Sequence, residues 1–291
     1  MRFKINPLVY PALATISWGT NAVAGRILVG EGHIDGITLT FVRFSLALPL
    51  LGIVALATRR SGDWESLARS GPMLTTAVLG LLGIAGFNIL FYTALGLMEA
   101  SLVSLLTSLA TPLTYIMAVL ISIDVLTASG LAGTLSSFAG TYFVLGPRLN
   151  GEYLGGVLAI GAAVAWSLYT IILRTRLPAR NQNIVIALTT FWGTLFTAPA
   201  VVVSGGPQLG NIGLREVLLI LYVAVVPGAI GYTLWNIGVE KVGAARSAIF
   251  IPLVPLTAAL LGVVLLGEKL TPLQAFGGLL ILAGIVLVVR K

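Results

Sequence analysis

Two stretches of the chain match one another without a gap: "YTALGLMEASLVSLLTSLATPL" at Tyr92–Leu113 and "YTLWNIGVEKVGAARSAIFIPL" at Tyr232–Leu253. Both begin with Tyr-Thr, and both carry a proline one residue before the end of the quoted stretch, beside a long apolar run. Proline is costly inside a helix because it removes a backbone hydrogen bond. Its occurrence at the same place in two similar segments indicates an internal duplication.

Other residue pairs favour the duplication at slightly different offsets. An offset of 144 residues pairs Gly133 with Gly277, and an offset of 148 residues pairs Trp18 with Trp166. Leucine, alanine and valine align by chance in any two apolar segments, so the matched prolines, glycines and tryptophans are the residues that favour a true repeat.

The composition is that of a membrane protein. The 291 residues are 57% hydrophobic and only 9% charged, and the mean hydropathy is +1.03. A soluble domain carries about 25% charged residues. No polar stretch is long enough to form a separate soluble domain, so the function must lie inside the lipid bilayer. The chain has no cysteine, which excludes disulfides and thiolate sites.

A helix needs roughly 20 apolar residues to cross a bilayer. Ten stretches meet this length, and they predict an all-α polytopic membrane protein with ten transmembrane helices. The predicted spans are 8–29, 37–57, 72–95, 101–122, 127–146, 153–173, 183–204, 214–238, 246–266 and 271–289.

A unit of five crossings is odd, so a second copy must enter the membrane from the opposite side. The sequence therefore predicts two inverted five-helix repeats, residues 1–148 and residues 149–291. In proteins built this way the binding site commonly lies near the midplane, between the repeats.

Basic residues gather on one side of this topology, the side of both termini. Lys and Arg in short loops remain in the cytoplasm, so we expect both termini to be cytoplasmic in a multi-pass protein of the bacterial inner membrane. The net charge of +7 is then a topology signature, and no nucleic acid is expected as a partner. The basic residues on the side of the termini are Arg2, Lys4, Arg59, Arg60, Arg69, Arg174, Arg176, Arg180, Lys241, Arg246, Arg290 and Lys291. Those on the other side are Arg26, Arg148, Arg215 and Lys269.

Aromatic and polar side chains in mid-span are candidates for substrate binding. Tryptophan belongs chiefly to the interfacial belts, yet three tryptophans lie well inside predicted spans, and Trp235, nearer a span end, is interpreted as a belt residue. Polar groups share helix faces with these aromatics and are costly against lipid. Binding and simple packing both remain open for the set: Trp18, Asn21, Asn88, Tyr92, Trp166, Tyr169, Trp192, Tyr232 and Asn236.

Arg43 is the one charged side chain well inside a predicted span. It is a candidate to attract a substrate carboxylate. Alternatively, it snorkels to the outer surface and pairs with Glu31 or Asp35.

Three prolines, Pro112, Pro252 and Pro255, are predicted to bend the fourth and ninth spans. Such bends serve either as static kinks or as hinges that open a central cavity. We expect the second role, gating.

Several function classes are excluded by what the spans lack. The carboxylates Glu99, Asp124, Glu240 and Glu268 all lie near span ends, so the buried proton-exchanging carboxylate of cation antiporters is not apparent. The sequence also has no phosphate-binding Gly-rich loop, no catalytic set and no metal-ligand cluster. We expect no enzyme, no cofactor and no metal.

The residues resemble those of the drug/metabolite transporter superfamily, in particular the ten-helix EamA type and its bacterial aromatic amino acid exporters. The likeness covers residues 7–289 and is strongest in the last fifty. One departure is that Gly267 and Glu268, after the ninth span, have no counterpart after the fourth. The matching stretches are "SWGTNAVAGRIL", "FVRFSLALPLL", the Tyr92–Leu113 stretch and "VGAARSAIFIPLVPLTAALLGVVLLGEKLTPLQAFGGLLILAGIVLV".

The resemblance implies a secondary transporter that exports amino acids, with an aromatic or hydrophobic bias, by alternating access around a central cavity. A carrier of nucleotide sugars or other anionic metabolites and a non-transporting membrane scaffold are the alternatives. The oligomeric state is left open.

Overall fold

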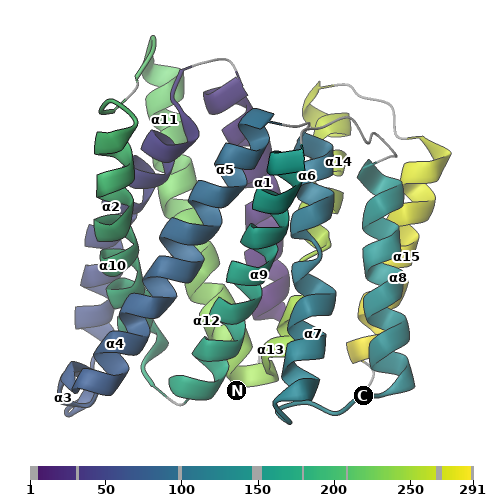
Figure 1. Ribbon diagram of the computed structural model, residues 1–291, viewed down its shortest axis with the longest axis horizontal. Helices are drawn as coiled ribbons and strands as arrows, with labels where there is room; N and C mark the ends of the chain where they lie inside the picture. The colour runs from purple at the N-terminus through teal and green to yellow at the C-terminus, as the bar shows by residue number, and fades with distance from the viewer. Residues whose placement is uncertain are drawn as a thin grey trace, which may run out of the picture.

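The computed structural model describes residues 6–30, 33–97, 100–145, 153–178, 180–207, 209–266 and 271–289. These residues form an all-helical bundle in which the helices run side by side, and α1 begins at the end of the bundle where α15 finishes (Figure 1). The elements are α1 (Val9–Gly30), α2 (Gly36–Thr58), α3 (Asp63–Ala68), α4 (Ser70–Leu79), η1 (Gly80–Gly86), α5 (Phe87–Leu97), α6 (Ala100–Thr107), α7 (Ala110–Leu120), α8 (Ala128–Leu145), α9 (Tyr153–Arg176), α10 (Gln182–Val203), α11 (Leu214–Val223), η2 (Ala224–Ile230), α12 (Gly231–Val242), α13 (Ala244–Ala248), α14 (Leu253–Leu266) and α15 (Pro272–Val289).

The ten predicted spans are confirmed to within a few residues at most ends. Within the described residues, eight helical segments are long and apolar enough to cross a membrane by length and composition, and α1 and α8 complete the set. Large apolar side chains such as Leu74 and Val203 are exposed on the outside, as a lipid-facing surface requires. Several predictions concern residues outside the described ranges. They are the boundary between residues 148 and 149, the residues Glu31, Glu99, Gly267 and Glu268, and the basic residues Arg2, Lys4, Arg148, Lys269, Arg290 and Lys291.

A π-helix interrupts the third and the eighth spans. In η1 the Phe87 N–H bonds to the Leu82 carbonyl, and in η2 the Gly231 N–H bonds to the Val226 carbonyl. Each bond reaches back five residues, as in a π-helix. The two π-helices are both seven residues long and occupy the same place in the two repeats.

The positions of the helices set the true offset between the repeats. Both π-helices, and α8 with α15, correspond at 144 residues, so the offset predicted from the glycines is confirmed. The ungapped match of Tyr92 with Tyr232, which is an offset of 140 residues, and the offset of 148 residues are each wrong by about one helical turn. Trp18 corresponds to Ala162, and Tyr92 corresponds to Asn236.

The fourth and ninth spans are broken helices rather than bent ones. The breaks fall between α6 and α7 and between α13 and α14. Pro112 and Pro255 are each the third residue of the helix that follows the break, and Pro252 lies inside the second break. Proline is tolerated in a first helical turn, where its missing N–H has no intrahelical partner. Pro112 and Pro255 thus occupy the same place in their helices, although they are 143 residues apart and so one residue off the common offset of 144. The predicted match of Pro112 with Pro252 is wrong.

A hydrogen bond joins the two breaks. Because Pro252 has no N–H, the Ala248 carbonyl cannot make its normal helical bond four residues on. The Thr111 hydroxyl donates to this carbonyl across 3.0 Å. The broken helices of the two repeats are thus tied together where their backbones depart from the helix.

Helices α8 and α15 pack through glycines. A Cβ on Gly140 would lie 2.5 Å from the Gly277 carbonyl oxygen, and a Cβ on Gly133 would lie 2.6 Å from that of Gly284. The residue numbers rise in one helix as they fall in the other, so the pair is antiparallel, as inverted repeats require. Ser136 adds a hydrogen bond of 3.1 Å to the Leu280 carbonyl. In Figure 1 this pair forms one side of the bundle.

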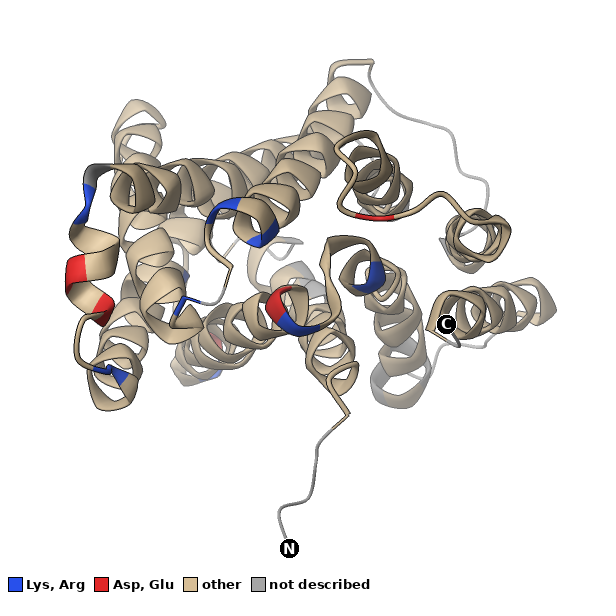
Figure 2. Cartoon of the chain, turned by 90° about the horizontal axis from the view of Figure 1, so that it is seen from below, with Lys and Arg blue, Asp and Glu red and all other residues tan. Residues whose placement is uncertain are grey.

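Charged residues lie mainly at the end of the bundle that holds the start of α1 and the end of α15, as Figure 2 shows from below.

At this end Asn181 links three elements. Its Nδ2 donates to the Asp63 carboxylate and to the Thr58 carbonyl, each across 2.9 Å, and its Oδ1 accepts from the Asn183 N–H and so caps α10.

Replacing Asn181 with alanine is expected to destabilise the protein by about 1 kcal/mol, the usual effect of losing a helix N-cap. The bonds of Asn181 to Thr58 and Asp63 would be lost with it, whereas the bond from Asn183 Nδ2 to the Thr58 hydroxyl, 3.0 Å long, would remain. Thermal unfolding in detergent tests this expectation, with Asn183→Ala, which leaves the cap oxygen in place, as the matched variant. An equal loss in both variants would contradict it.

Asp63 gives this link a pH dependence. The hydrogen bond from Asn181, followed by that from the Arg60 N–H, holds the pKa of the Asp63 carboxyl below its ordinary value. A lowered pKa in the folded state stabilises the protein above the unfolded pKa, and this stabilisation is lost as the pH falls through the folded pKa. The difference in melting temperature between the parent and Asp63→Asn should therefore shrink as the pH is lowered below about 4.

Candidate functional site

Three tryptophans from three helices meet in the interior of the bundle. The ring of Trp18 on α1 lies 5.0 Å from that of Trp166 on α9 and 5.2 Å from that of Trp235 on α12, centroid to centroid. Trp166 and Trp235 are 5.5 Å apart. Tyr232, one turn before Trp235, lies 5.5 Å from Trp18 and 5.7 Å from Trp166. We call these four residues the aromatic cluster.

Further aromatic rings surround the aromatic cluster. Tyr169 stacks on Trp166 at 5.1 Å, Phe87 packs on the same tryptophan at 5.2 Å, and Phe44 meets Tyr232 edge to face at 5.4 Å. These contacts join α2, α5, α9 and α12, which belong to both repeats. Trp18 and Trp166, which the offset of 148 residues pairs in the sequence, contact one another in the structure, but they are not equivalent residues of the repeat.

Trp235 is not a belt residue, and that prediction is wrong. Its side chain is fully buried, because α12 continues to Val242 and places Trp235 about two turns from the helix end. Its indole Nε1 is buried and has no hydrogen-bond partner. The signal that could have placed it is its spacing of three residues from Tyr232, which puts both on one helix face.

The carbonyls of the two π-helices bind the aromatic cluster. Trp18 Nε1 donates to the Pro227 carbonyl of η2 across 3.0 Å, and the Tyr232 hydroxyl donates to the Gly83 carbonyl of η1 across 3.1 Å. Gly83 and Pro227 are equivalent residues at the offset of 144. Each π-helix thus offers the same carbonyl to an aromatic donor from the other repeat.

Two asparagines complete this polar shell. Asn88 Nδ2 donates to the Ile84 carbonyl across 2.7 Å and approaches the Tyr232 hydroxyl at 3.4 Å. The Tyr169 hydroxyl donates to Asn236 Oδ1 across 2.6 Å, and Asn236 Nδ2 is buried without a partner. The predicted polar residues therefore lie on the aromatic cluster, with one donor still unused.

Arg43 is buried beside the aromatic cluster and has no charged partner among the described residues. Only 2% of its surface is exposed, and the predicted snorkelling to the surface is wrong. Nη1 donates to Asn21 Oδ1 across 3.4 Å, and Nε has no partner. Asp35 instead caps α2 through bonds from the Ile37 and Thr38 N–H groups.

Tyr92 and Trp192 are not brought into the aromatic cluster. Tyr92 packs in a separate apolar group with Leu39 and Val223. The ring contacts of Trp192 are with Phe191 and Phe196 of its own helix, and both phenylalanines are substantially exposed. Conversely, sequence reasoning missed Phe44 and Phe87, which carry no polar group to single them out.

The bundle is duplicated, holds an aromatic cluster shared by its two halves and, within the residues that the structure describes, buries Arg43 without a charged partner; these features fit a membrane transporter. The EamA-like transporter family matches this chain twice, at residues 7–146 and 153–290. The chain belongs to this family, whose members are transporters and not enzymes, and it is a multi-pass membrane protein.

Named relatives align over almost the whole chain. An "Uncharacterized transporter YyaM" of Bacillus subtilis is 27% identical over 95% of this chain and 92% of its own. A "Probable amino-acid metabolite efflux pump" of Salmonella typhimurium is 26% identical, over 94% and 91%. A "Probable terminal-alkyne amino-acid exporter" of Streptantibioticus cattleyicolor is 26% identical, over 99% and 95%. A solved crystal structure, 22% identical, superposes with a TM-score of 0.81 over 98% of this chain and 96% of that one, which shows the fold.

Proposed function

We propose that this transporter exports amino acids, with an aromatic or hydrophobic bias, from the cytoplasm across a bacterial inner membrane. The observation that carries the proposal is Arg43, a buried guanidinium with no carboxylate partner among the described residues. An isolated buried charge is strongly unfavourable unless it is paired. A substrate carboxylate supplies the missing partner, and guanidinium binds carboxylate with good geometry.

The aromatic cluster supplies the rest of the site. Indole and phenol rings stack on flat or apolar side chains and attract an ammonium group by cation–π contact. Since the rings already contact one another, we propose that a substrate separates some of them when it binds. The proposed substrate residues are those members of the predicted set that lie on or beside the aromatic cluster: Trp18, Asn21, Arg43, Asn88, Trp166, Tyr169, Tyr232 and Asn236. Tyr92 and Trp192, the other two members of the predicted set, lie outside the cluster.

The broken helices are the proposed gates for alternating access. The bond between Thr111 and the Ala248 carbonyl closes the two breaks on one another, and opening must separate them. Pro112, Pro252 and Pro255 keep the backbone from closing into continuous helices. We further propose two five-helix units, 1–148 and 149–291, and cytoplasmic termini, on the basis of the charged end seen in Figure 2.

Efflux from proteoliposomes tests the proposal. Preloaded radiolabelled phenylalanine should leave faster than through protein-free vesicles, and threonine and lysine should show the breadth of the site. Trp166→Ala should slow phenylalanine efflux about tenfold, the effect of losing one favourable aromatic contact. Phe191→Ala, an aromatic deletion on the exposed surface, is the control and should have no effect.

A pH gradient across the vesicles separates coupled from facilitated export. No efflux of any of the three amino acids by folded protein would overturn the proposal and favour nucleotide sugars or other anions. Unchanged transport in Trp166→Ala would show that the aromatic cluster only packs the helices.

A further inference from the structure

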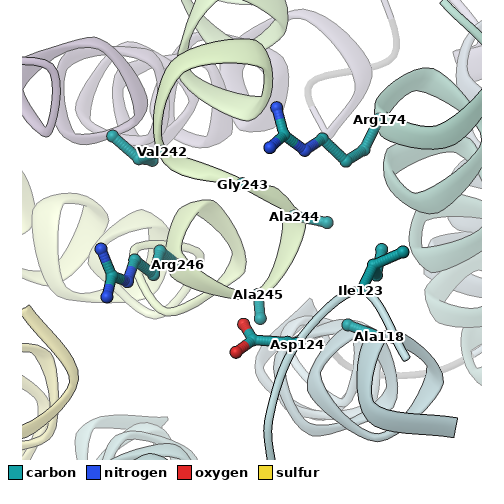
Figure 3. A pocket seen from close by; sticks show the side chains of 9 residues that line it. All are labelled: Ala118, Ile123, Asp124, Arg174, Val242, Gly243, Ala244, Ala245 and Arg246. Carbon is teal, nitrogen blue, oxygen red and sulfur yellow. The ribbon is translucent and has the colours of Figure 1, made fainter. Parts of the chain in front are cut away.

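A polar cavity opens at the charged end of the bundle, away from the aromatic cluster. Its volume is about 180 Å³, and it lies among the ends of α7, α9 and α12 and the start of α13. In Figure 3 the side chains of Arg174 and Asp124 reach toward the Gly243–Ala245 turn from two sides, and the side chain of Arg246 extends away from the turn. The lining residues are Ala118, Ile123, Asp124, Arg174, Val242, Gly243, Ala244, Ala245 and Arg246.

The cavity carries both signs of charge. Arg174 is held in place by its hydrogen bond to the Glu240 carbonyl, and Arg246 extends from α13 (Figure 3). Asp124, from the segment after α7, supplies the opposite charge. No hydrogen bond or ion pair among the described residues joins Asp124 to either arginine. Two cations and an anion around one small cavity match a ligand that carries a carboxylate and an ammonium together.

Buried hydroxyls continue from the cavity toward the aromatic cluster. Thr114 lies one turn from Ala118 on α7, and Ser247 lies one turn from Ala244 on α13, so each shares a face with a cavity residue. Both side chains are fully buried, and neither hydroxyl has a hydrogen-bond partner. An unpartnered buried hydroxyl is unfavourable, and a polar group passing between α7 and α13 would supply the missing hydrogen bonds.

The same interface leads on to the tryptophans. One turn beyond Thr114, Thr111 bonds to the Ala248 carbonyl. Next to it, the Ser167 hydroxyl bonds to the Ala110 carbonyl across 3.2 Å. Ser167 directly follows Trp166 of the aromatic cluster. Four buried hydroxyl groups, those of Thr114, Ser247, Thr111 and Ser167, therefore lie between the cavity and the aromatic cluster.

We propose that this cavity is the entry vestibule for amino acids, where Arg246 and Arg174 bind the carboxylate and Asp124 binds the ammonium group. This proposal rests on the proposed function, amino-acid export, and adds a second binding site for the amino acid to the transporter. Substrate bound there passes between α7 and α13 once the Thr111 bond opens, and Arg43 takes over its carboxylate at the aromatic cluster.

Uptake into oriented membrane vesicles tests the vestibule. In vesicles with the charged end facing outward, Arg246→Gln and Asp124→Asn should each raise the KM for phenylalanine about tenfold and leave the maximal rate nearly unchanged. In vesicles of opposite orientation the KM should stay at the parental value, because substrate then enters from the other side. Arg176→Gln, an exposed arginine two residues beyond Arg174, is the charge-matched control.

Each outcome has a definite meaning. If the parent transports phenylalanine and both variants behave like Arg176→Gln, the proposal of an entry vestibule is wrong and the proposed function stands. If the KM rises equally from both sides, the residues act on the central site and the vestibule is again wrong. If the folded parent moves no amino acid, both the proposed function and the ligand assigned to the vestibule fail.

Discussion

Replacing Arg43 with glutamine is expected to reduce amino-acid transport about a hundredfold or more, while the melting temperature stays the same or rises. The loss of transport follows because one member of a buried charged pair with the substrate carboxylate is removed. The gain in stability follows because the resting protein no longer buries a guanidinium that lacks a charged partner. A residue that only held the helices together would lower both quantities.

Two further variants sharpen the Arg43 experiment. Arg43→Lys keeps the charge but loses the planar fork, so transport should fall less than in Arg43→Gln. Arg59→Gln removes an exposed arginine at the C-terminal end of the same helix and should change neither quantity. Efflux from proteoliposomes and thermal unfolding in detergent are the two measurements. Full transport in Arg43→Gln would remove the carboxylate site from the proposed mechanism.

Replacing Gly140 with valine is expected to destabilise the protein by about 3 kcal/mol, at the upper end of the usual effect of overpacking. The Cβ would lie 2.5 Å from the Gly277 carbonyl oxygen and 2.8 Å from the Ile281 nitrogen. Because these are backbone atoms, the clash cannot be relieved by a change of side-chain rotamer. Helices α8 and α15 would have to separate along their contact, and the hydrogen bonds of Ser136 and Ser137 to α15 would be lost.

Gly156→Val is the matched variant for this prediction. Gly156 lies inside α9, and the nearest atom to a Cβ there is the flexible end of Leu106 at 3.9 Å. It should fold and transport nearly as the parent does, whereas Gly140→Val should yield little folded protein after extraction. Normal yield and thermal stability of Gly140→Val would show that the two helices tolerate separation.

The sequence predicts the spans well because the requirement is simple: a stretch of apolar residues must cover the thickness of the bilayer. It predicts the duplication for a similar reason, since matched glycines such as Gly133 and Gly277 occupy a backbone contact that admits no side chain. The register between repeats is harder, because an error of one turn keeps the same helix face toward the interior. The match of Tyr92 with Tyr232 failed in this way.

Interruptions of the helices could not be predicted from hydropathy, because the hydrogen-bond pattern of a helix leaves its apolar character unchanged. The π-helices are an example, and so is the true length of the eighth span, which runs to Val242. That extra length carries Trp235 into the core. In the candidate site, the residues with a polar or charged group could be predicted from the sequence, because such groups are unfavourable in contact with lipid and must face the interior of the bundle. Phe44 and Phe87, which look like any packing residue, could not.

The two π-helices also bear on the history of the chain. A π-helix is rare and occurs mostly as a single turn within an α-helix, frequently at a functional site. In this protein the irregularity has the same length and the same place in both repeats, although the residues that form it differ, "GLLGIAG" against "AVVPGAI". Two differing sequences that share the same irregularity at equivalent positions indicate that it preceded the duplication, because otherwise it would have arisen twice in the same place.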